Sequence, residues 1–331
     1  MSRNMSSLAI APVDILRFAL DHSDVGVALV TLVGITGSSP RAIGAQMAVA
    51  TDGSSLGSFS GGCIEAAIVG EALSVLAAGE SRLVRFGAGS PYIDIRLPCG
   101  GGIDLLLTPN PDRRALAEIL VQLDARERAA MRIATTHIAT GEPGDAPTGW
   151  SGDIFHVGFV PRLRIVAMGH GDALLATARL AYFYGAETHA LSPSPDDIAL
   201  LRADGIEATL LKDHVRTPEL KPDDWTAFAI LFHDHAWEEN LLPWVLRGPH
   251  FSVSAIGGGP SRISRRAMLL REGFAEAVAN QFNRPAGLIP ATRDPAALAL
   301  SIISEIIDRF QTLRATVSLS EFPERMAAAA E

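Results

Sequence analysis

Cysteine is scarce in this sequence: Cys63 and Cys99 are the only two among 331 residues. Two thiols cannot build the disulfide framework that stabilises small secreted domains. The chain also lacks an uninterrupted apolar run of about 18 residues, which a membrane-spanning helix requires, and it does not begin with the apolar stretch of a signal peptide. These absences predict a cytoplasmic protein without a membrane span.

Positive charge is also in short supply. The chain has 28 Lys and Arg against 37 Asp and Glu, a formal net charge of −9. Nucleic-acid-binding proteins normally present a basic face, so no nucleic-acid partner is expected. The 48% of hydrophobic residues supplies a generous core. The length predicts two domains, because domains usually have about 100–200 residues.

The first domain, residues 1–140, is predicted to be mixed α+β. Strand patterns at 25–35, 82–86 and 103–109 are rich in branched apolar residues, and Asp52-Gly53 is typical of a hairpin turn. From Ile64 the apolar spacing becomes helical and ends near Gly79. Further helices are predicted at 13–21 and 112–124, and a further strand at 131–140.

Glycine and proline dominate "GEPGDAPTGWSGD", so residues 141–160 are predicted to be a linker. After it, five strands alternate with helices over residues 161–315. Such repeated βα units predict a Rossmann-like, doubly wound parallel sheet. The fold class is therefore α/β, with a long helix at 295–313 and a C-terminal tail at 316–331.

The turn Gly169-His170-Gly171 lies between a predicted strand and a predicted helix. In that context, glycines let a pyrophosphate approach the backbone at a helix N-terminus. Two departures weaken the fingerprint: Leu174 takes the place of the third glycine, and Ser192 stands where an acid would bind a ribose. A phosphate-bearing ligand and a simple tight turn remain alternatives. Asp196 and Asp197 follow, in or near the next helix.

Other polar groups follow strands of the second domain. His233 and Asp234 come directly after the fourth strand, where open α/β sheets bind ligands. They are interpreted as polar groups of a pocket, because no third metal ligand at a telling spacing is visible. A glycine run and three arginines follow the fifth strand, and they fit either anion contacts or a solvated surface: Arg262, Arg265 and Arg266.

The loop "GSSPRAIGAQM" in the first domain offers several hydrogen-bond donors. Its hydroxyls and guanidinium suit an oxyanion or a heteroaromatic ring with many acceptors. A solvated loop capped by its own serines is the alternative. The candidate ligand-binding residues are Ser38, Ser39, Arg41 and Gln46.

Both cysteines adjoin glycines. Gly61 and Gly62 precede Cys63 at a predicted helix start, where backbone amides stabilise a thiolate. Glu65 is either a neighbour of that thiol or an acid that complements the helix dipole. Cys99 precedes Gly100 and Gly101. The two cysteines are either buried small residues or thiols that line one cofactor pocket.

Taken together, "GSSPRAIGAQM", "GSFSGGCIEAAI" and "PCGGGIDLLLTP", in this order, resemble the XdhC/CoxI family. Its members are accessory proteins of xanthine dehydrogenase and related molybdenum hydroxylases. The second half is similar to the family's Rossmann-like domain through "GHG", "FHDHAWEENLLPWVL" and "IGGGPSRISRRAMLL". The resemblance covers roughly residues 13–313. "SPSPDD" departs from the acid-containing strand end that is usual there.

The resemblance implies a non-catalytic chaperone that binds molybdenum cofactor, protects its sulfurated form and delivers it to an apo-hydroxylase. It also implies a homodimer that works with a cysteine desulfurase. The cofactor, molybdopterin, carries a phosphate, a dithiolene and a pterin, which glycine backbone, Arg41 and a thiol could bind. Soft sulfur suits molybdenum, so Cys63 and Cys99 are candidate metal ligands. The alternative function is an NAD(P)-dependent oxidoreductase that uses the Gly169–Gly171 turn.

Overall fold

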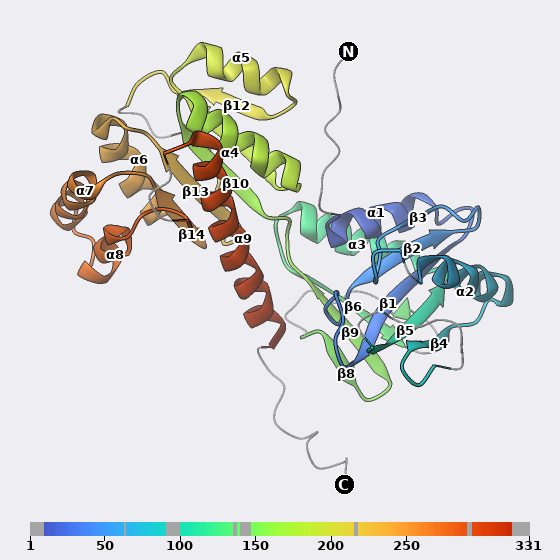
Figure 1. Ribbon diagram of the computed structural model, residues 1–331. Coiled ribbons are helices and arrows are strands. Elements are labelled where there is room, and N and C mark those ends of the chain that lie inside the picture. Colours follow the sequence, from blue (N-terminus) through green and yellow to red (C-terminus); the bar gives the residue numbers. More distant parts are fainter. Residues whose placement is uncertain are drawn as a thin grey trace, which may run out of the picture. The chain divides into compact units, whose positions relative to one another are not determined.

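The computed structural model divides the chain into two compact units, Ile10–Pro161 and Arg162–Leu313 (Figure 1). Each unit is described by itself. The helices of the described chain include none with the length and apolar character needed to cross a membrane. The structure describes residues 10–62, 64–90, 100–134, 138–139, 147–214, 218–289 and 293–319.

The first unit is built on a five-stranded antiparallel sheet in the order β3-β2-β1-β5-β4. The central strand is long and almost entirely buried, because both faces of the sheet are covered. This explains its continuous apolar sequence. The strands are β1 (Val27–Thr36), β2 (Gln46–Ala50), β3 (Ser55–Leu56), β4 (Arg82–Gly87) and β5 (Gly102–Pro109).

Helices cover both faces of this sheet. Alternate residues of β1 point to opposite faces. Ala28 and Val30 pack in the core that α2 (Glu65–Ala78) covers, whereas Val27 and Leu29 pack in the core shared with the other two helices. Those two helices are α1 (Pro12–Asp21) and α3 (Arg113–Asp124). The helices predicted at 13–21 and 112–124 and the hairpin at Asp52-Gly53 are confirmed.

A second, four-stranded antiparallel sheet completes this unit in the order β7-β6-β9-β8. It corrects the predicted linker at 141–160, since β8 and β9 fall within that stretch. Phe155, Val157 and Phe159 are buried on one face of β9, and Trp150 donates from Nε1 to the carbonyl oxygen of Val33 at 3.2 Å. The strands are β6 (Ala129–Ala134), β7 (Ile138–Ala139), β8 (Gly149–Ser151) and β9 (Ile154–Phe159).

The second unit contains a five-stranded, fully parallel sheet in the order β12-β11-β10-β13-β14. The order reverses between β10 and β13, which makes this the topological switch point. The predicted Rossmann-like, doubly wound sheet is confirmed (Figure 1). The strands are β10 (Arg164–Gly169), β11 (Glu187–Ser192), β12 (Glu207–Leu210), β13 (Thr226–Leu231) and β14 (Ser252–Ala255).

Right-handed crossovers place the helices on the two faces of this parallel sheet. Helices α4 and α5 pack on β10, β11 and β12, and α6 and α7 enclose the core around Val166, Met168 and Phe228. The long predicted helix begins at Pro295 and extends to Leu319. The elements are α4 (Gly171–Tyr184), α5 (Pro195–Ala203), α6 (His235–Arg247), α7 (Gly259–Arg271), α8 (Glu276–Asn280), η1 (Gln281–Asn283) and α9 (Pro295–Leu319).

Candidate functional site

The antiparallel order of the first sheet brings three loops to one end. This end carries the C-termini of β1, β3 and β4 and the N-termini of β2 and β5. The loop 37–45 joins β1 to β2, the loop 57–64 joins β3 to α2, and the loop 88–101 joins β4 to β5. These loops carry the three glycine-containing motifs of the first unit. We call this the loop end of the sheet. Cys63 and Cys99 belong to these loops by sequence but lie outside the described residues.

Two of the predicted residues meet directly at the loop end. Thr36 of β1 lies opposite Gly102 of β5. A Cβ atom added to Gly101 would come within 2.5 Å of the carbonyl oxygen of Ser38. The backbone of Gly101 therefore passes too close to the serine loop for any side chain. Gly100 beside it has a positive φ of 70°, which glycine adopts without strain.

The serine loop lies at the surface of the unit. The hydroxyl of Ser39 donates to the carbonyl oxygen of Arg41 at 2.9 Å and accepts from its backbone nitrogen at 3.2 Å. This local turn occupies Ser39, as the alternative of a self-capped loop predicted. Ser38 and Arg41 are exposed. The guanidinium of Arg41 makes no ion pair with any residue that the structure describes, so its charge is available to a ligand.

Gln46 does not lie on the surface of that loop. It is the first residue of β2, is 2% exposed, and its Nε2 donates to Thr31 Oγ1 at 3.2 Å and approaches Met131 Sδ at 3.8 Å. The structure thus places the Gln46 amide inside the unit, and this placement does not support the expected ligand contact. The predicted loop therefore ends two residues too late, because Gln46 and Met47 belong to the buried strand β2.

Glu65 holds the glycine loop in shape. Its carboxylate accepts backbone N–H groups of Phe59, Ser60, Gly61 and Gly62 at 2.8 to 3.1 Å. It also accepts the Ser60 hydroxyl at 2.7 Å. The amides around Gly61 and Gly62 therefore already bind an anion, which is the side chain of Glu65. The sequence leaves Glu65 either as a neighbour of the thiol or as an acid at the helix start. The described contacts are those of an acid at the helix start.

These donors also determine the charge of Glu65. Partial burial opposes ionisation and would raise its pKa. The hydrogen bonds from the backbone and hydroxyl of Ser60 and from the backbone of Phe59 outweigh burial and lower the pKa of Glu65 to about 2. The carboxylate is consequently ionised throughout the physiological pH range.

A second cation-bearing residue at the loop end was not singled out from the sequence. Arg85 of β4 pairs with Asp104 at 2.9 Å and donates to the Thr36 hydroxyl at 2.9 Å and to the carbonyl oxygen of Ala88 at 2.7 Å. Its partners come from three different segments of the chain. Arg85 thus links the end of β1, strand β5 and the loop 88–101. No local motif indicates such a role.

In the second unit, the glycine turn joins β10 to α4, as predicted, and it lies at the switch point. A Cβ on Gly169 would fall 2.7 Å from Leu231 Cβ, so glycine is needed for the close contact of β10 with β13. Gly171 has a φ of +69° with open space around it, so it is needed for its conformation. His170 between them is exposed.

The amide that a pyrophosphate would use at this turn is occupied. The backbone N–H of Gly171 donates to Asp197 Oδ2 at 2.9 Å, and the Ser192 hydroxyl donates to the same oxygen at 2.9 Å. Asp197 is 6% exposed and belongs to the first turn of α5. An acid is expected at the end of β11, and Asp197 supplies one in the first turn of the next helix, α5. Its carboxylate binds the amide that an anionic ligand would use.

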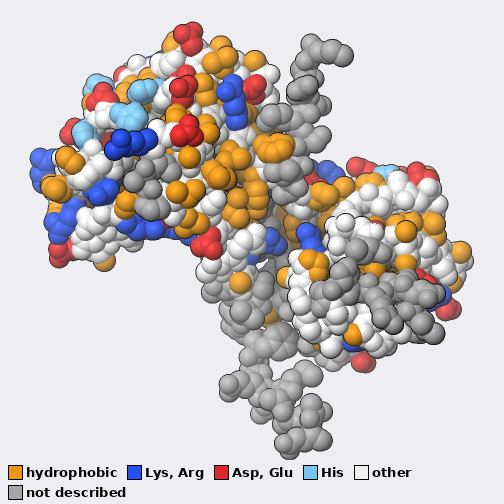
Figure 2. Space-filling view, viewed as in Figure 1, with side chains coloured by type: hydrophobic (Ala, Val, Ile, Leu, Met, Phe, Trp, Pro, Cys, Tyr) orange, Lys and Arg blue, Asp and Glu red, His pale blue; other side chains and the backbone are white. Residues whose placement is uncertain are grey.

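His233 and Asp234 lie across the switch point from this turn. Asp234 is the N-cap of α6 and accepts the backbone N–H of Ala236 at 2.9 Å, while His233 is exposed. Asp234 therefore has a structural role at the helix start. Figure 2 shows histidine side chains gathered on the surface of the second unit near α6.

Aromatic rings also lie at the carboxyl end of these parallel strands. Phe232 stacks on Trp237 with centroids 5.5 Å apart and ring planes at 11°. His170 and His214 flank this pair at 6.2 and 5.9 Å from the respective ring. Within the described residues, no group of three or more histidines, cysteines or carboxylates is arranged to hold a metal ion. The proposed metal ligands Cys63 and Cys99 fall outside that part.

The three arginines after β14 are structural. Arg265 is 2% exposed, pairs with the buried Glu238 of α6, and donates to the carbonyl oxygen of Ile256 at 2.5 Å. Arg266 pairs with Glu276, and Arg262 reaches the carbonyl oxygen of Gly257 at 3.3 Å. Arg265 joins α7 to α6 behind the end of β14. The alternative of solvated arginines is therefore wrong for Arg265.

Comparison with known proteins gives consistent matches in both units. Residues 20–87 match the model of the XdhC and CoxI family, and residues 165–306 match the XdhC Rossmann domain. The molybdenum cofactor insertion chaperone PaoD of Escherichia coli (strain K12) is 34% identical over 295 residues, which cover 88% of this chain and 86% of that protein.

A solved structure matches nearly the whole chain. It is a Bacillus halodurans protein described as a xanthine dehydrogenase. The TM-score is 0.70 at 19% identity, over 92% of this chain and 96% of the other. At that identity the likeness demonstrates a shared fold.

Proposed function

Because this chain belongs to the XdhC and CoxI family, we propose that it is a chaperone that binds molybdenum cofactor and delivers it to a molybdenum hydroxylase such as xanthine dehydrogenase. The observation that carries the proposal is the similarity to a molybdenum cofactor insertion chaperone over 88% of this chain. The cofactor is cargo in this function, and the protein itself need not catalyse a reaction.

The loop end of the first unit supports the proposal chemically. It collects three glycine-containing loops at one place, with the exposed Ser38 and with Arg41, whose guanidinium makes no ion pair with the described residues. Hydroxyl and guanidinium donors suit the phosphate and the many acceptors of a pterin. Gly100 has open space where a side chain would lie, so a ligand can approach the backbone there. We propose that this end binds the cofactor, with Cys63 and Cys99 as the sulfur donors to molybdenum.

The contacts of Glu65 refine this proposal. Its carboxylate uses the amides of Gly61 and Gly62, so these two glycines shape the loop and leave ligand binding to its remaining groups. The role proposed for this fixed loop is to support Cys63, which follows Gly62 in the sequence. Glu65 would thus act by positioning Cys63 and would not contact the cofactor itself.

Three further parts of the proposal concern the cell. We propose that the protein protects the sulfurated form of the cofactor, receives its sulfur through a cysteine desulfurase, and works as a cytoplasmic homodimer.

The second unit would serve in recognition of the partner enzyme, through His170, His233 and the neighbouring aromatic rings at the carboxyl end of its parallel strands. Dinucleotide-dependent oxidation is disfavoured, because Asp197 fills the anion position at Gly171.

Retention of the cofactor tests the proposal directly. The purified protein is incubated without oxygen with molybdenum cofactor released from a donor enzyme, and unbound cofactor is removed by gel filtration. We expect pterin fluorescence to remain with the protein and an apo-hydroxylase to gain activity when it is added. Absence of retained pterin, together with tight NAD(H) binding and hydride transfer, would overturn the proposal.

Variants separate cargo binding from folding. Arg41→Gln is expected to weaken retention, while Arg17→Gln, which removes an exposed pair with Asp124 in the same unit, serves as the control. Cys63→Ala and Cys99→Ala should lose retention at an unchanged melting temperature. Retention at the wild-type level in both cysteine variants would show that neither thiol handles the cofactor.

A further inference from the structure

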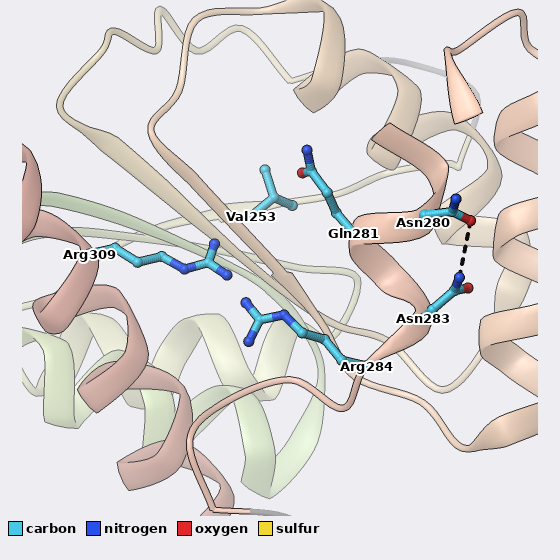
Figure 3. A pocket seen from close by; sticks show the side chains of 6 residues that line it. All are labelled: Val253, Asn280, Gln281, Asn283, Arg284 and Arg309. Carbon is cyan, nitrogen blue, oxygen red and sulfur yellow. Dashed lines mark hydrogen bonds between the residues drawn. The ribbon is translucent and has the colours of Figure 1, made fainter. Parts of the chain in front are cut away.

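A cavity of about 430 Å³ lies in the second unit at the free edge of the parallel sheet. Figure 3 shows two arginine side chains that enter it from opposite sides and face one another. The edge strand β14, the α8–η1 segment and α9 surround it, so it is separate from the switch point between β10 and β13. Its lining residues are Val253, Asn280, Gln281, Asn283, Arg284 and Arg309.

One buried carboxylate orients both arginines. Arg284 and Arg309 each pair through Nη2 with the same atom, Oε1 of Glu305, the latter at 2.7 Å. The other oxygen of Glu305 accepts the backbone N–H of Gly287 at 2.7 Å and the Ser254 hydroxyl at 3.2 Å. Glu305 is 3% exposed, and both of its oxygens are satisfied. The carboxylate therefore acts as a fixed support behind the two guanidinium groups.

The charges at this place do not cancel. Two guanidinium groups stay positive at any pH that proteins tolerate, and within the described part of the chain they pair with a single carboxylate, Glu305. No carboxylate is among the residues that line the cavity. Each guanidinium has five N–H donors, and only some are used by Glu305 and by the Ser252 hydroxyl, which binds Arg309 Nη1 at 3.0 Å. A positive, donor-rich cavity stands out in a chain with a net charge of −9.

The amide side chains add neutral hydrogen-bonding groups. Asn283 donates to Asn280 Oδ1 at 3.1 Å, and Arg266 donates to the same oxygen at 2.8 Å, which fixes the Asn280 amide. Gln281 is exposed, and its side chain makes no hydrogen bond within the described part of the chain. Amide groups of this kind bind the polar body of a ligand whose charge is held elsewhere.

We propose that this cavity binds a small organic oxyanion, a phosphate monoester or a carboxylate, held by Arg284 and Arg309. Paired guanidinium groups match the oxygen geometry of both anions through two parallel hydrogen bonds. The volume lies within the range of about 300–1,000 Å³ that is common for small-molecule sites. This site is independent of the cofactor proposal, since it lies in the other unit.

Calorimetric titration of the full-length protein tests the site. Phosphate and glycerol phosphate form one arm, and succinate and citrate form the other, with sodium chloride of equal ionic strength as the blank. Saturable binding in either arm supports the proposal, and the arm that binds more tightly identifies the anion. The absence of saturable heat in both arms overturns it.

Charge variants at Gln281 make the test independent of the Glu305 pairs. Gln281→Glu brings a negative charge into the cavity and should weaken binding about tenfold or more, while Gln281→Lys should tighten it. Gln311→Glu and Gln311→Lys make the same changes at an exposed position of α9 outside the lining, and should leave binding within about twofold. Equal effects at both positions would overturn the proposal. Melting temperatures confirm that all four variants fold.

Discussion

The carboxylate of Asp197 lies 2.9 Å from the backbone nitrogen of Gly171 and accepts its N–H. In the loop 57–64, the carboxylate of Glu65 likewise accepts the backbone N–H of Gly62 at 2.8 Å. In each unit, a glycine turn whose backbone could bind a ligand phosphate binds an acid of the chain itself. At these two places the glycine amides therefore stabilise the fold.

Replacement of Asp197 should therefore cost stability. Asp197→Asn weakens two hydrogen bonds to a buried acceptor, and we expect a loss of about 1–3 kcal/mol in the free energy of unfolding. Urea denaturation measures it. Asp196→Asn, at the exposed neighbouring position, should change the free energy by less than about 0.5 kcal/mol. Equal losses in the two variants would contradict the role given to Asp197.

Because Asp197 occupies the amide of Gly171, we also expect the glycine turn not to bind a dinucleotide. Wild-type protein should show no saturable binding of pyrophosphate or NADH by calorimetry, because Asp197 occupies the Gly171 amide and repels a second negative charge. Asp197→Asn removes the repulsion and should bind pyrophosphate more tightly than wild type. Tight NADH binding by the wild type would contradict this account.

Glu65 should make stability depend on acid pH. Its pKa falls from 4.5 in the unfolded chain to about 2 in the fold. The native state therefore releases the proton more readily, so the stabilisation is complete above pH 4.5 and is lost as pH falls toward 2. Because the carboxylate is partly exposed, we expect about 1–2 kcal/mol at neutral pH.

Glu65→Gln tests this dependence. The variant should lose that stability at pH 7 and show a flatter decline in acid, as measured by thermal unfolding over a pH series. Glu80→Gln, an exposed acid just after the same helix, serves as the control and should follow the wild-type curve. A Glu65→Gln curve parallel to that of the wild type would rule out the assigned hydrogen bonds.

The buried pair of Glu238 and Arg265 should respond strongly to single changes. Glu238→Gln leaves the Arg265 charge buried without its partner, and we expect a loss of about 3–5 kcal/mol. The double variant Glu238→Gln with Arg265→Met removes both charges and should recover part of that loss. Denaturation of the wild type, Glu238→Gln, Arg265→Met and the double variant measures the coupling. Additive losses would show that the two side chains act independently.

Two glycines of the first unit should respond in opposite directions to alanine. Gly101→Ala places a Cβ 2.5 Å from the Ser38 carbonyl oxygen and should destabilise the loop end. Gly70→Ala meets open space within α2 and should stabilise the helix by about 0.5–1 kcal/mol. Thermal unfolding compares them. Cofactor retention should fall in the first variant and stay unchanged in the second.

Much of the fold could be predicted because each signal is local. The βα alternation of the second unit and the turn at Asp52-Gly53 rest on neighbouring residues, and both are confirmed. The linker prediction failed because glycine and proline around 141–153 outweighed the alternating apolar residues of β9, Phe155, Val157 and Phe159. That period-two pattern was visible and would have predicted the strand.

The candidate site could be predicted less fully, because its decisive contacts join distant segments. Nothing local indicates that Asp197 reaches Gly171, 26 positions earlier. The burial of Gln46 likewise depends on Met131, which lies on another sheet. Glu305 and Arg309 are one helical turn apart, but Arg284 reaches Glu305 from 21 positions earlier, so no local motif indicates their cavity.

The loop end of the first sheet has a consequence for how such a chain can diversify. Its three loops are joined to strands whose registers are set by the buried core on both faces. Substitutions, insertions and deletions in the loops leave those registers intact. Related chains can thus keep one scaffold and vary the side chains at its loop end through short surface segments, without a new fold having to evolve.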